Sequence, residues 1–247
     1  MVNNYKVIIH FDGTNYSGWQ YQKEGIKTVQ GELLRVLKII GKKKIVITGS
    51  SRTDAGVHST GMTANFHLNF KIEPESLIKA MNSMLPEDIR VVKCELADRS
   101  FNARFGAKQK TYVYKIFTGD ILSPFKYRYY AHIPYPLDTK LMRKALKYFK
   151  GEKDFSSFTS DEPEKKKVRT IDEIKMNVNK DEIVFTIKGK SFLRYMVRNI
   201  VGTIIDIGRG KIDLKELPDI FEAKDRRMAG QTAPARGLCL KEVVYDE

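Results

Sequence analysis

The densest group of residues that could perform chemistry is the stretch Gly49–His58, GSSRTDAGVH. Asp54 stands among small residues, which predicts an accessible carboxylate. Arg52 could keep that carboxylate ionised, because a nearby positive charge lowers the pKa of a carboxyl group. The stretch follows a predicted strand, and loops at strand ends commonly carry functional groups. An Asp before a small residue and Gly is also a common turn former, so from these residues alone both interpretations stay open.

A second group lies in Phe192–Gly202, FLRYMVRNIVG. Arg194 and Arg198 are four positions apart, so they would share one face of a helix. The rest of the segment is strongly apolar, which predicts burial, and a buried arginine needs an anion such as a carboxylate or a phosphate. The alternative is that both arginines extend their aliphatic stems to reach solvent.

Two tyrosines form a third group. Tyr112 and Tyr114 alternate within the expected strand, so they would lie on one face of a sheet. Aromatic rings beside basic residues such as Lys110 and Lys115 could stack on a nucleic-acid base. The alternative is ordinary aromatic packing on a sheet.

Metal and cofactor chemistry finds little support in the sequence. It lacks the phosphate loop G-x-x-x-x-G-K-[ST], and its two cysteines allow no zinc-binding spacing. The histidines also lack ligand spacing. Neighbouring carboxylates occur as pairs on expected loops, Asp161-Glu162 and Asp181-Glu182, which does not indicate a two-metal nuclease. We therefore expect no metal and no cofactor.

The elements that must position these groups mix strands and helices in both halves of the chain. Hydrophobic periodicity and turn residues predict strands over 5–12, 44–48, 61–70 and 89–96 and helices over 28–40 and 74–84. They predict further strands over 111–117, 168–178, 182–188 and 238–244 and helices over 137–150, 191–207 and 214–223. We expect an α+β chain of two comparable halves, 1–107 and 108–247.

The charge of the chain points to a polyanionic partner. The formal net charge is +14 and the pI about 9.6, and the surplus is spread over both halves. No apolar run approaches the roughly 18 residues of a membrane span. The start of the chain also lacks a signal segment. We expect a cytoplasmic protein with no membrane partner.

Taken together, these residues resemble the TruA family of tRNA pseudouridine synthases over nearly the whole chain. The loop Arg52–His58 matches the catalytic loop of that family residue for residue. The other matching motifs follow in the family's order: Phe11–Gln20, FDGTNYSGWQ; Phe101–Phe105, FNARF, with Lys110–Tyr112; Met196–Gly202, MVRNIVG; and Gly237–Leu240, GLCL. Two departures are visible: Ser51 stands where the family usually has Gly, and Ser59 replaces a frequent Ala.

The resemblance implies a role for each candidate residue. Asp54 would be the nucleophile, Tyr112 the active-site tyrosine and Arg198 the arginine that pairs with the aspartate. Arg52 would contact RNA and help to open the base pair. The implied fold has two α+β halves joined through one continuous, mainly antiparallel sheet, with helices packed on it and a basic cleft between the halves. The implied protein is a homodimer without a metal or cofactor, and its targets are uridines 38, 39 and 40 in the anticodon stem-loop of tRNA.

Three other functions remain open at this stage. The chain could be a non-catalytic RNA-binding protein in which Asp54 only forms a turn. It could be a metal-dependent RNA-processing hydrolase. It could also be a related synthase that acts on another RNA or another position. The choice between attack by Asp54 on uracil C6 and on ribose C1′ is open as well, and so is the choice between base and stacking platform for Tyr112.

The net charge generates a first testable expectation. Each phosphate contact made by Lys or Arg releases counterions, so tRNA binding should weaken steeply as salt rises. Filter binding over a series of salt concentrations measures the slope of log K against log salt. A flat dependence would contradict an RNA-binding surface built from these charges.

Overall fold

The computed structural model describes residues 2–160 and 166–246. The carboxylate pair Asp161-Glu162 lies outside these residues. The chain forms two compact units, which are described separately below. Unit 1 contains residues 1–108 and 239–247, and unit 2 contains residues 109–238.

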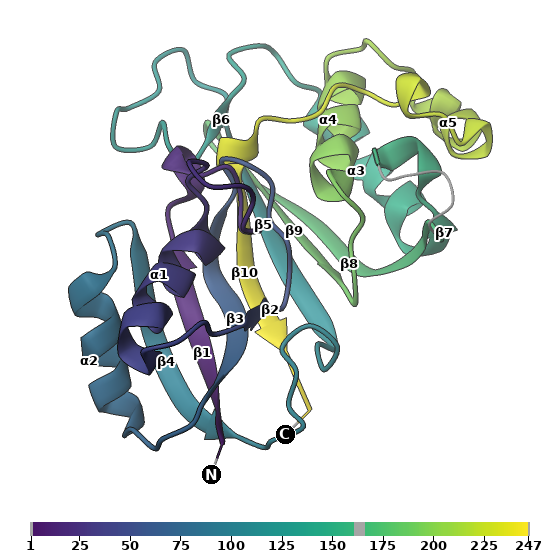
Figure 1. The fold of residues 1–247 in the computed structure, drawn as a ribbon. Helices are drawn as coiled ribbons and strands as arrows, with labels where there is room; N and C mark the ends of the chain where they lie inside the picture. The colour runs from purple at the N-terminus through teal and green to yellow at the C-terminus, as the bar shows by residue number, and fades with distance from the viewer. Residues whose placement is uncertain (1, 161–165, 247) are drawn as a thin grey trace. The chain divides into compact units, whose positions relative to one another are not determined.

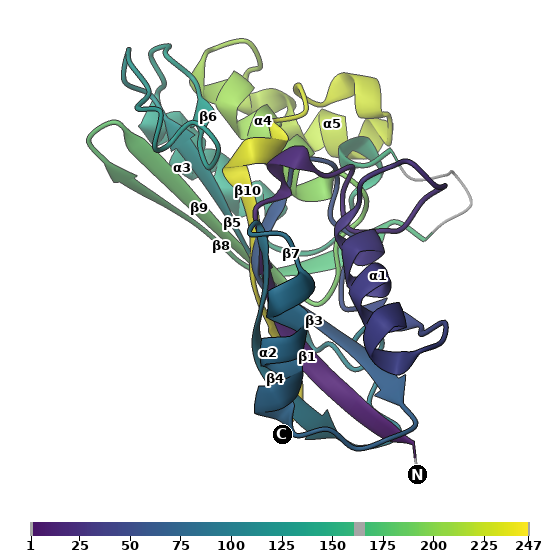
Figure 2. The same cartoon turned by 60° about the vertical axis from the view of Figure 1, so that its left-hand side comes forward.

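Unit 1 is a sheet with two helices on one face (Figures 1 and 2). Its elements in chain order are β1 (Asn3–Phe11), α1 (Val29–Gly41), β2 (Ile47–Gly49), β3 (His58–Leu68), α2 (Pro74–Met84), β4 (Ile89–Ala97) and most of β10 (Leu238–Val244). The strand order is β4-β1-β3-β10, with β2 paired to β3. β1 is antiparallel to both β3 and β4, whereas β10 runs parallel to β3.

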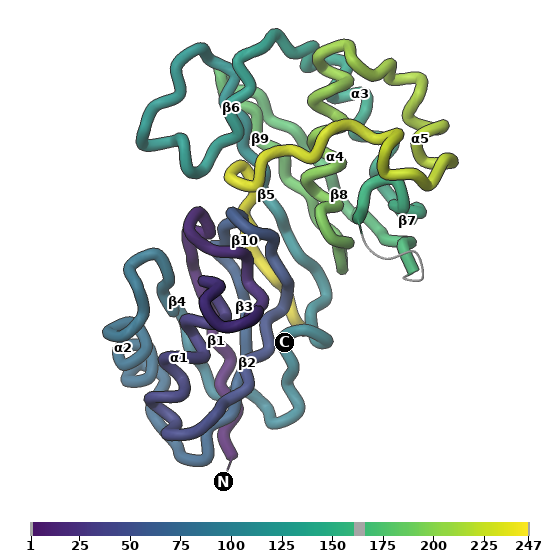
Figure 3. The backbone as a smooth tube through the Cα atoms, turned by 45° about the horizontal axis from the view of Figure 1, so that its top comes forward, coloured from purple at the N-terminus to yellow at the C-terminus, as the bar shows by residue number. Residues whose placement is uncertain are grey.

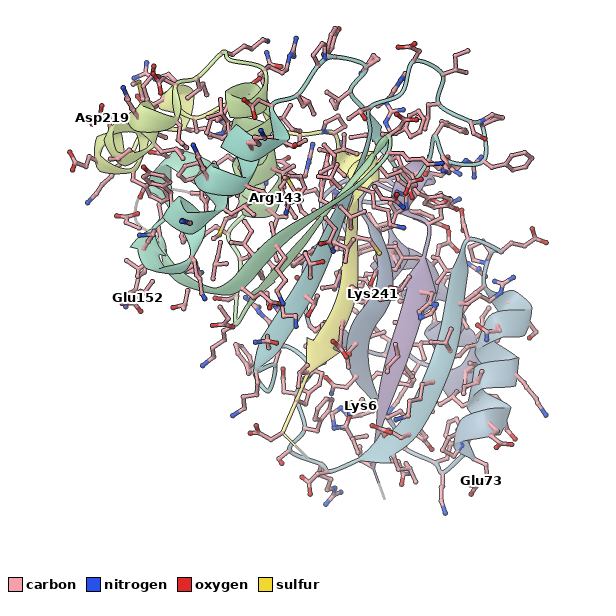
Figure 4. All side chains as sticks on the ribbon, turned by 180° about the vertical axis from the view of Figure 1, so that it is seen from behind. Lys6, Glu73, Arg143, Glu152, Asp219 and Lys241 are labelled. Carbon is pink, nitrogen blue, oxygen red and sulfur yellow. The ribbon has the colours of Figure 1, made fainter. Side chains whose placement is uncertain are left out.

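Unit 2 has the same kind of architecture. Its elements are β5 (Gln109–Phe117), β6 (Ala131–His132), α3 (Thr139–Phe149), β7 (Gly151–Asp154), β8 (Val168–Asn179), β9 (Glu182–Gly189), α4 (Met196–Gly208) and α5 (Leu217–Ala223). The strand order is β5-β9-β8-β7, with β6 beside β5. β9 is antiparallel to both β5 and β8. Figure 4 labels Arg143 of α3, which donates to the Met176 carbonyl at 2.7 Å.

The two units repeat one pattern of pairing. In unit 1 the first strand β1 pairs with β3, and β3 pairs with β2, all antiparallel. In unit 2 the first strand β5 pairs with β9, and β9 pairs with β8, again antiparallel. In each unit a helix separates the first strand from the next of these strands in the chain, α1 between β1 and β2 and α3 between β5 and β8. The expected α+β class is confirmed, and the expected division into two comparable halves stays a prediction.

Several element boundaries follow directly from the sequence. Thr28 caps α1, because its hydroxyl accepts from the Gly31 amide at 3.1 Å. Pro74 opens α2 at a position where its missing N–H costs no helical bond. Asp138 caps α3 by accepting from the amides of Lys140 and Leu141. The predicted helix 74–84 is confirmed at both ends.

The helix predicted over 191–207 is wrong at its start, because α4 begins at Met196. Tyr195 adopts a left-handed conformation with φ 59°, which interrupts any helical run from residue 191. Arg194 therefore precedes the helix, and the interpretation that Arg194 and Arg198 share one helical face is wrong. The short strand β7 was not predicted, and the strand predicted over 44–48 lies later, at β2.

The last strand joins an element far away in sequence. Cys239 and Leu240 of β10 pair with His58 and Ser59 at the start of β3. Residues 239–247 thus pack with unit 1, whereas the sequence analysis placed them in the second half. The sequence could not indicate this, because a single terminal strand carries no information about its partner.

An aromatic cluster forms part of the core of unit 2. The ring of Phe158 lies 5.2 Å from that of Phe149, 6.1 Å from Phe155 and 4.9 Å from Phe221, measured between centroids. Phe158 is fully buried. Such aromatic pairs add to the free energy gained from burial alone.

We expect Phe158→Ala to lower the free energy of unfolding by about 3–5 kcal/mol, since it leaves a cavity among the remaining rings. Urea denaturation followed by circular dichroism measures the change. Ile121→Ala is the matched control, because Ile121 is 87% exposed and its loss should cost less than about 0.5 kcal/mol. Equal effects of the two substitutions would contradict the packing described here.

Candidate active site

The loop that carries Asp54 connects β2 to β3 in unit 1. Thr53 is buried, whereas Arg52 is exposed and Asp54 is partly exposed. The Val57 amide donates to the main-chain carbonyl of Asp54 at 3.2 Å and closes the turn. The turn is thus closed through the backbone carbonyl of Asp54.

The segment Gly13–Trp19 holds this loop through main-chain hydrogen bonds. The Trp19 amide donates to the Thr53 carbonyl at 3.1 Å, and the Gly56 amide donates to the Tyr16 carbonyl at 3.2 Å. Gly18 has φ 92°, and a Cβ at this position would lie 2.5 Å from the Thr53 carbonyl oxygen. Only glycine fits here, because both the conformation and the close approach exclude a side chain. The backbone is therefore fixed on both sides of Asp54.

Tyr16 anchors the Gly13–Trp19 segment to the rest of unit 1. Its hydroxyl donates to the carboxylate of Asp88, and Lys27 Nζ lies 4.6 Å from its ring centroid. Burial raises the pKa of Tyr16, and the bond to Asp88 raises it further. The Tyr16 hydroxyl therefore stays protonated and donates to Asp88. This bond anchors the residue whose main-chain carbonyl accepts from the Gly56 amide.

His58, at the end of the loop, contacts the same segment. Its Nδ1 lies 3.0 Å from the Gly13 amide and 3.1 Å from Asp12 Oδ1. A neutral ring accepts from the amide, and a protonated ring donates to the carboxylate. Either state joins the two segments, which gives this buried histidine a structural role.

The two departures from the family pattern have simple structural consequences. Ser51 is not among the described residues with positive φ, so its backbone requires no glycine. Ser59 is buried, and its hydroxyl donates to the Leu240 carbonyl at 2.9 Å and accepts from the Gly61 amide. Ser59 thus helps to bind β10 to β3.

Arg198 lies in the first turn of α4 in unit 2. Its Nε donates to the Ala233 carbonyl at 2.8 Å, and the Ala233 amide donates to the Arg198 carbonyl at 3.1 Å. The guanidinium also lies 5.2 Å from the ring centroid of Tyr195.

Tyr112 and Tyr114 lie on one face of β5, as their alternation predicts, and both are buried. The Tyr112 ring packs edge-on against Phe192, with 5.1 Å between centroids. The Tyr114 hydroxyl donates to the Pro234 carbonyl at 2.8 Å. Burial raises the pKa of Tyr114, although Arg198 and Arg236 oppose the shift.

The candidate residues divide between the units, with Arg52 and Asp54 in unit 1 and Tyr112 and Arg198 in unit 2. The Phe11–Gln20 motif is part of the family resemblance, but its contacts with the Asp54 loop appear only in the structure. The contacts between α4 and the segment around Ala233 likewise appear only in the structure. The sequence signal for these contacts is the glycines, such as Gly18 and Gly202, because only glycine lets two main-chain segments approach so closely.

Two observations concern metals and membranes. No three His, Cys, Asp or Glu side chains of residues 2–160 and 166–246 form a group that could hold a metal ion. None of the helices in these ranges has the length and apolar character needed to cross a membrane.

Comparison with known proteins gives a consistent result. A family model described as tRNA pseudouridine synthase matches residues 7–106 and 145–246. The tRNA pseudouridine synthase A of Thermodesulfovibrio yellowstonii is 40% identical over 253 residues, which cover 98% of this chain and 99% of that protein. The protein of the same name from Geobacillus sp. strain WCH70 is 44% identical over 248 residues, which cover 100% of both.

One solved structure, a Cbf5-Nop10-Gar1 complex, aligns with 82% of this chain and 45% of that chain at 13% identity. Its TM-score of 0.38 is too low to support an argument.

The contacts of Gly18 can be tested with a matched pair of substitutions. Gly18→Ala should displace the Asp54 loop, because its Cβ would meet the Thr53 carbonyl oxygen. Gly25→Ala is the control, since Gly25 also has positive φ, at 87°, but nothing lies within 4 Å of the added Cβ. We expect the amides of Trp19 and Gly56 to exchange with solvent at least about tenfold faster in Gly18→Ala only. Hydrogen exchange measured by NMR gives these rates, and equal protection in both variants would contradict this account.

Proposed function

Because the chain belongs to the tRNA pseudouridine synthase family, we propose that it isomerises uridine to pseudouridine in tRNA with Asp54 as the nucleophile. The observation that carries the role of Asp54 is the geometry of its loop. Main-chain bonds from Gly13–Trp19 fix the backbone before and after Asp54, so the loop presents its side chain from a defined position.

The reaction breaks the N1–C1′ bond of uridine and forms a C5–C1′ bond. C5 loses a proton and N1 gains one, so atoms and charge balance without an oxidant or an imported group. Covalent attachment to Asp54 would hold the uracil while it turns. Attack on C6 and attack on C1′ both meet this requirement.

Arg198 supplies the charge that the nucleophile needs. An aspartate is ionised at neutral pH, with an ordinary pKa of about 3.9, but desolvation by a bound base would raise that pKa. A guanidinium beside the carboxylate opposes the rise. The contacts of Arg198 with Ala233 and Tyr195 fix its orientation for this task.

Tyr112 would contact the uracil, either as a stacking surface or as the base that removes the C5 proton. Its packing against Phe192 restricts ring rotation.

Arg52 is exposed beside Asp54, where it would contact RNA and help to extrude the base from its pair. Extrusion costs roughly a few kcal/mol, which phosphate contacts of the basic surface offset.

The finer features follow the family resemblance and remain part of the proposal. They are the targets at tRNA positions 38, 39 and 40, a homodimer, and a cytoplasmic location. We propose no metal and no cofactor, in agreement with the balance of the reaction.

The nucleophile is tested by tritium release from tRNA that carries [5-³H]uridine. We expect Asp54→Asn to bind tRNA normally but to release tritium on the order of 10⁴-fold more slowly, because an amide is a poor nucleophile. Asp219→Asn is the control, since Asp219 is an exposed carboxylate on α5 (Figure 4).

Full activity of Asp54→Asn would refute the role of Asp54. Absence of release by the wild-type protein on any tRNA would refute the enzymatic assignment and favour a non-catalytic RNA-binding protein. Loss of activity in excess EDTA together with cleavage of the RNA backbone would favour a metal-dependent hydrolase. Mapping the modified position separates the proposed target from that of a related synthase.

A further inference from the structure

An extended segment, Gly230–Pro234, runs along α4 and is called the strap below. Figure 3 shows the chain after α5 passing beside α4 on its way to β10. Glycine permits the close approach, because a Cβ on Gly202 of α4 would lie 1.7 Å from the Gln231 carbonyl oxygen. The strap amides are bound by α4 side chains. Gly230 donates to Thr203 Oγ1 at 2.9 Å, and Gln231 donates to Asp206 Oδ2 at 3.0 Å.

Two successive carbonyls of the strap hold side chains near the candidate site. The Ala233 carbonyl accepts from Arg198 Nε at 2.8 Å, and the Pro234 carbonyl accepts from the Tyr114 hydroxyl at 2.8 Å. The orientation of the Arg198 guanidinium therefore depends on where the strap backbone lies.

Arg226, which precedes the strap in sequence, links the strap to α4. Its Nη2 donates to Asn199 Oδ1 and to Thr232 Oγ1, both at 3.0 Å, and its Nη1 donates to the Ala229 carbonyl at 3.2 Å. Thr232 Oγ1 in turn donates to Asn199 Oδ1 at 2.7 Å. Asn199 is fully buried in α4, next to Arg198.

The acceptors of Arg226 are unusual for an arginine. They are an amide oxygen, a hydroxyl and a carbonyl, and no carboxylate pairs with Arg226 among the residues that the structure describes. The neighbouring Arg227 is different, since it is exposed and forms an ion pair with Asp225. Burial lowers the pKa of Arg226. A partly buried cation on neutral acceptors is costly, and this sets Arg226 apart from the exposed, ion-paired Arg227.

We propose that Arg226, acting through Asn199 and Thr232, is a positioning residue that fixes the strap and thereby orients Arg198 for the reaction. The inference rests on the proposed function, in which Arg198 acts on the nucleophile or the substrate. Arg226 itself contacts neither. Its planar fork holds three oxygens at once in a fixed geometry.

The position of the Arg198 guanidinium can be measured without any assay of activity. In protein labelled with ¹⁵N at arginine, the Nε–H of Arg198 should exchange slowly, because it donates to Ala233. The signal is assigned by its loss in Arg198→Lys. We expect Arg226→Gln and Thr232→Val to accelerate this exchange at least about tenfold, while Arg227→Gln leaves it unchanged.

The catalytic consequence is measured as the single-turnover rate at saturating enzyme. Arg226→Gln and Thr232→Val should each lower that rate about 10- to 100-fold without a change in the Kd for tRNA, since a misplaced group costs rate rather than binding. Thr232→Ser keeps the hydroxyl and should keep the rate, and Arg227→Gln should match the wild type. Thr232 is exposed, so its substitution tests the network even where Arg226→Gln fails to fold.

A double-mutant cycle separates positioning from general stability. If Arg226 acts only through Arg198, Arg226→Gln should have no further effect on the rate in an Arg198→Lys background. The proposal would be overturned if the two effects on the rate multiply in the double variant. It would also be overturned if Arg226→Gln leaves the Nε–H exchange of Arg198 unchanged, or if it weakens the Kd for tRNA at an unchanged rate. A wild-type protein with no activity would refute the proposed function instead, and loss of Nε–H protection in Arg226→Gln would still establish the link from Arg226 to Arg198.

Discussion

The placement of the proposed nucleophile depends on main-chain hydrogen bonds between two segments that are distant in sequence. The bonds from Trp19 to Thr53 and from Gly56 to Tyr16 set the backbone of the loop before and after Asp54. Backbone groups have no rotamers, so these bonds define the Cα position of Asp54 more tightly than side-chain contacts would. Arg198 is held in a related way, since its Nε binds a backbone carbonyl of the strap. In both units a distant segment of chain supplies the support.

Much of the fold follows from local sequence signals. A capping threonine, a proline at a first helical position and alternating apolar strands gave α1, α2 and β1 within a few residues. The errors arose where tertiary structure overrides local preference. Tyr195 resembles a helical residue by type, but its left-handed conformation delays the start of α4. A left-handed conformation at a non-glycine residue costs about 1–2 kcal/mol, which packing elsewhere must offset. No local pattern could indicate that.

The residues proposed to perform chemistry could be found from sequence because they lie in motifs with characteristic spacing. Asp54 stood out through its small neighbours and Arg198 through a charge in an apolar helix. The residues that support them could not be found in this way. Asn199 and Arg226 are separated by 27 positions, and Asn199 and Thr232 by 33. Their relation exists only in the folded chain, where Gly202 admits the strap to the surface of α4.

The pairing of β10 with β3 has a consequence for how the protein is made. Residues 239–244 complete the sheet that begins with β1, so unit 2 is an insertion within unit 1. On the ribosome, the first hundred residues emerge early, yet the start of β3 at His58 and Ser59 lacks its β10 partner until almost the whole chain has been translated. Exposed edges of this kind invite pairing with other strands. The nascent protein must therefore protect a partly formed sheet while its inserted unit folds, and a fragment that ends at residue 108 would keep this vulnerability permanently.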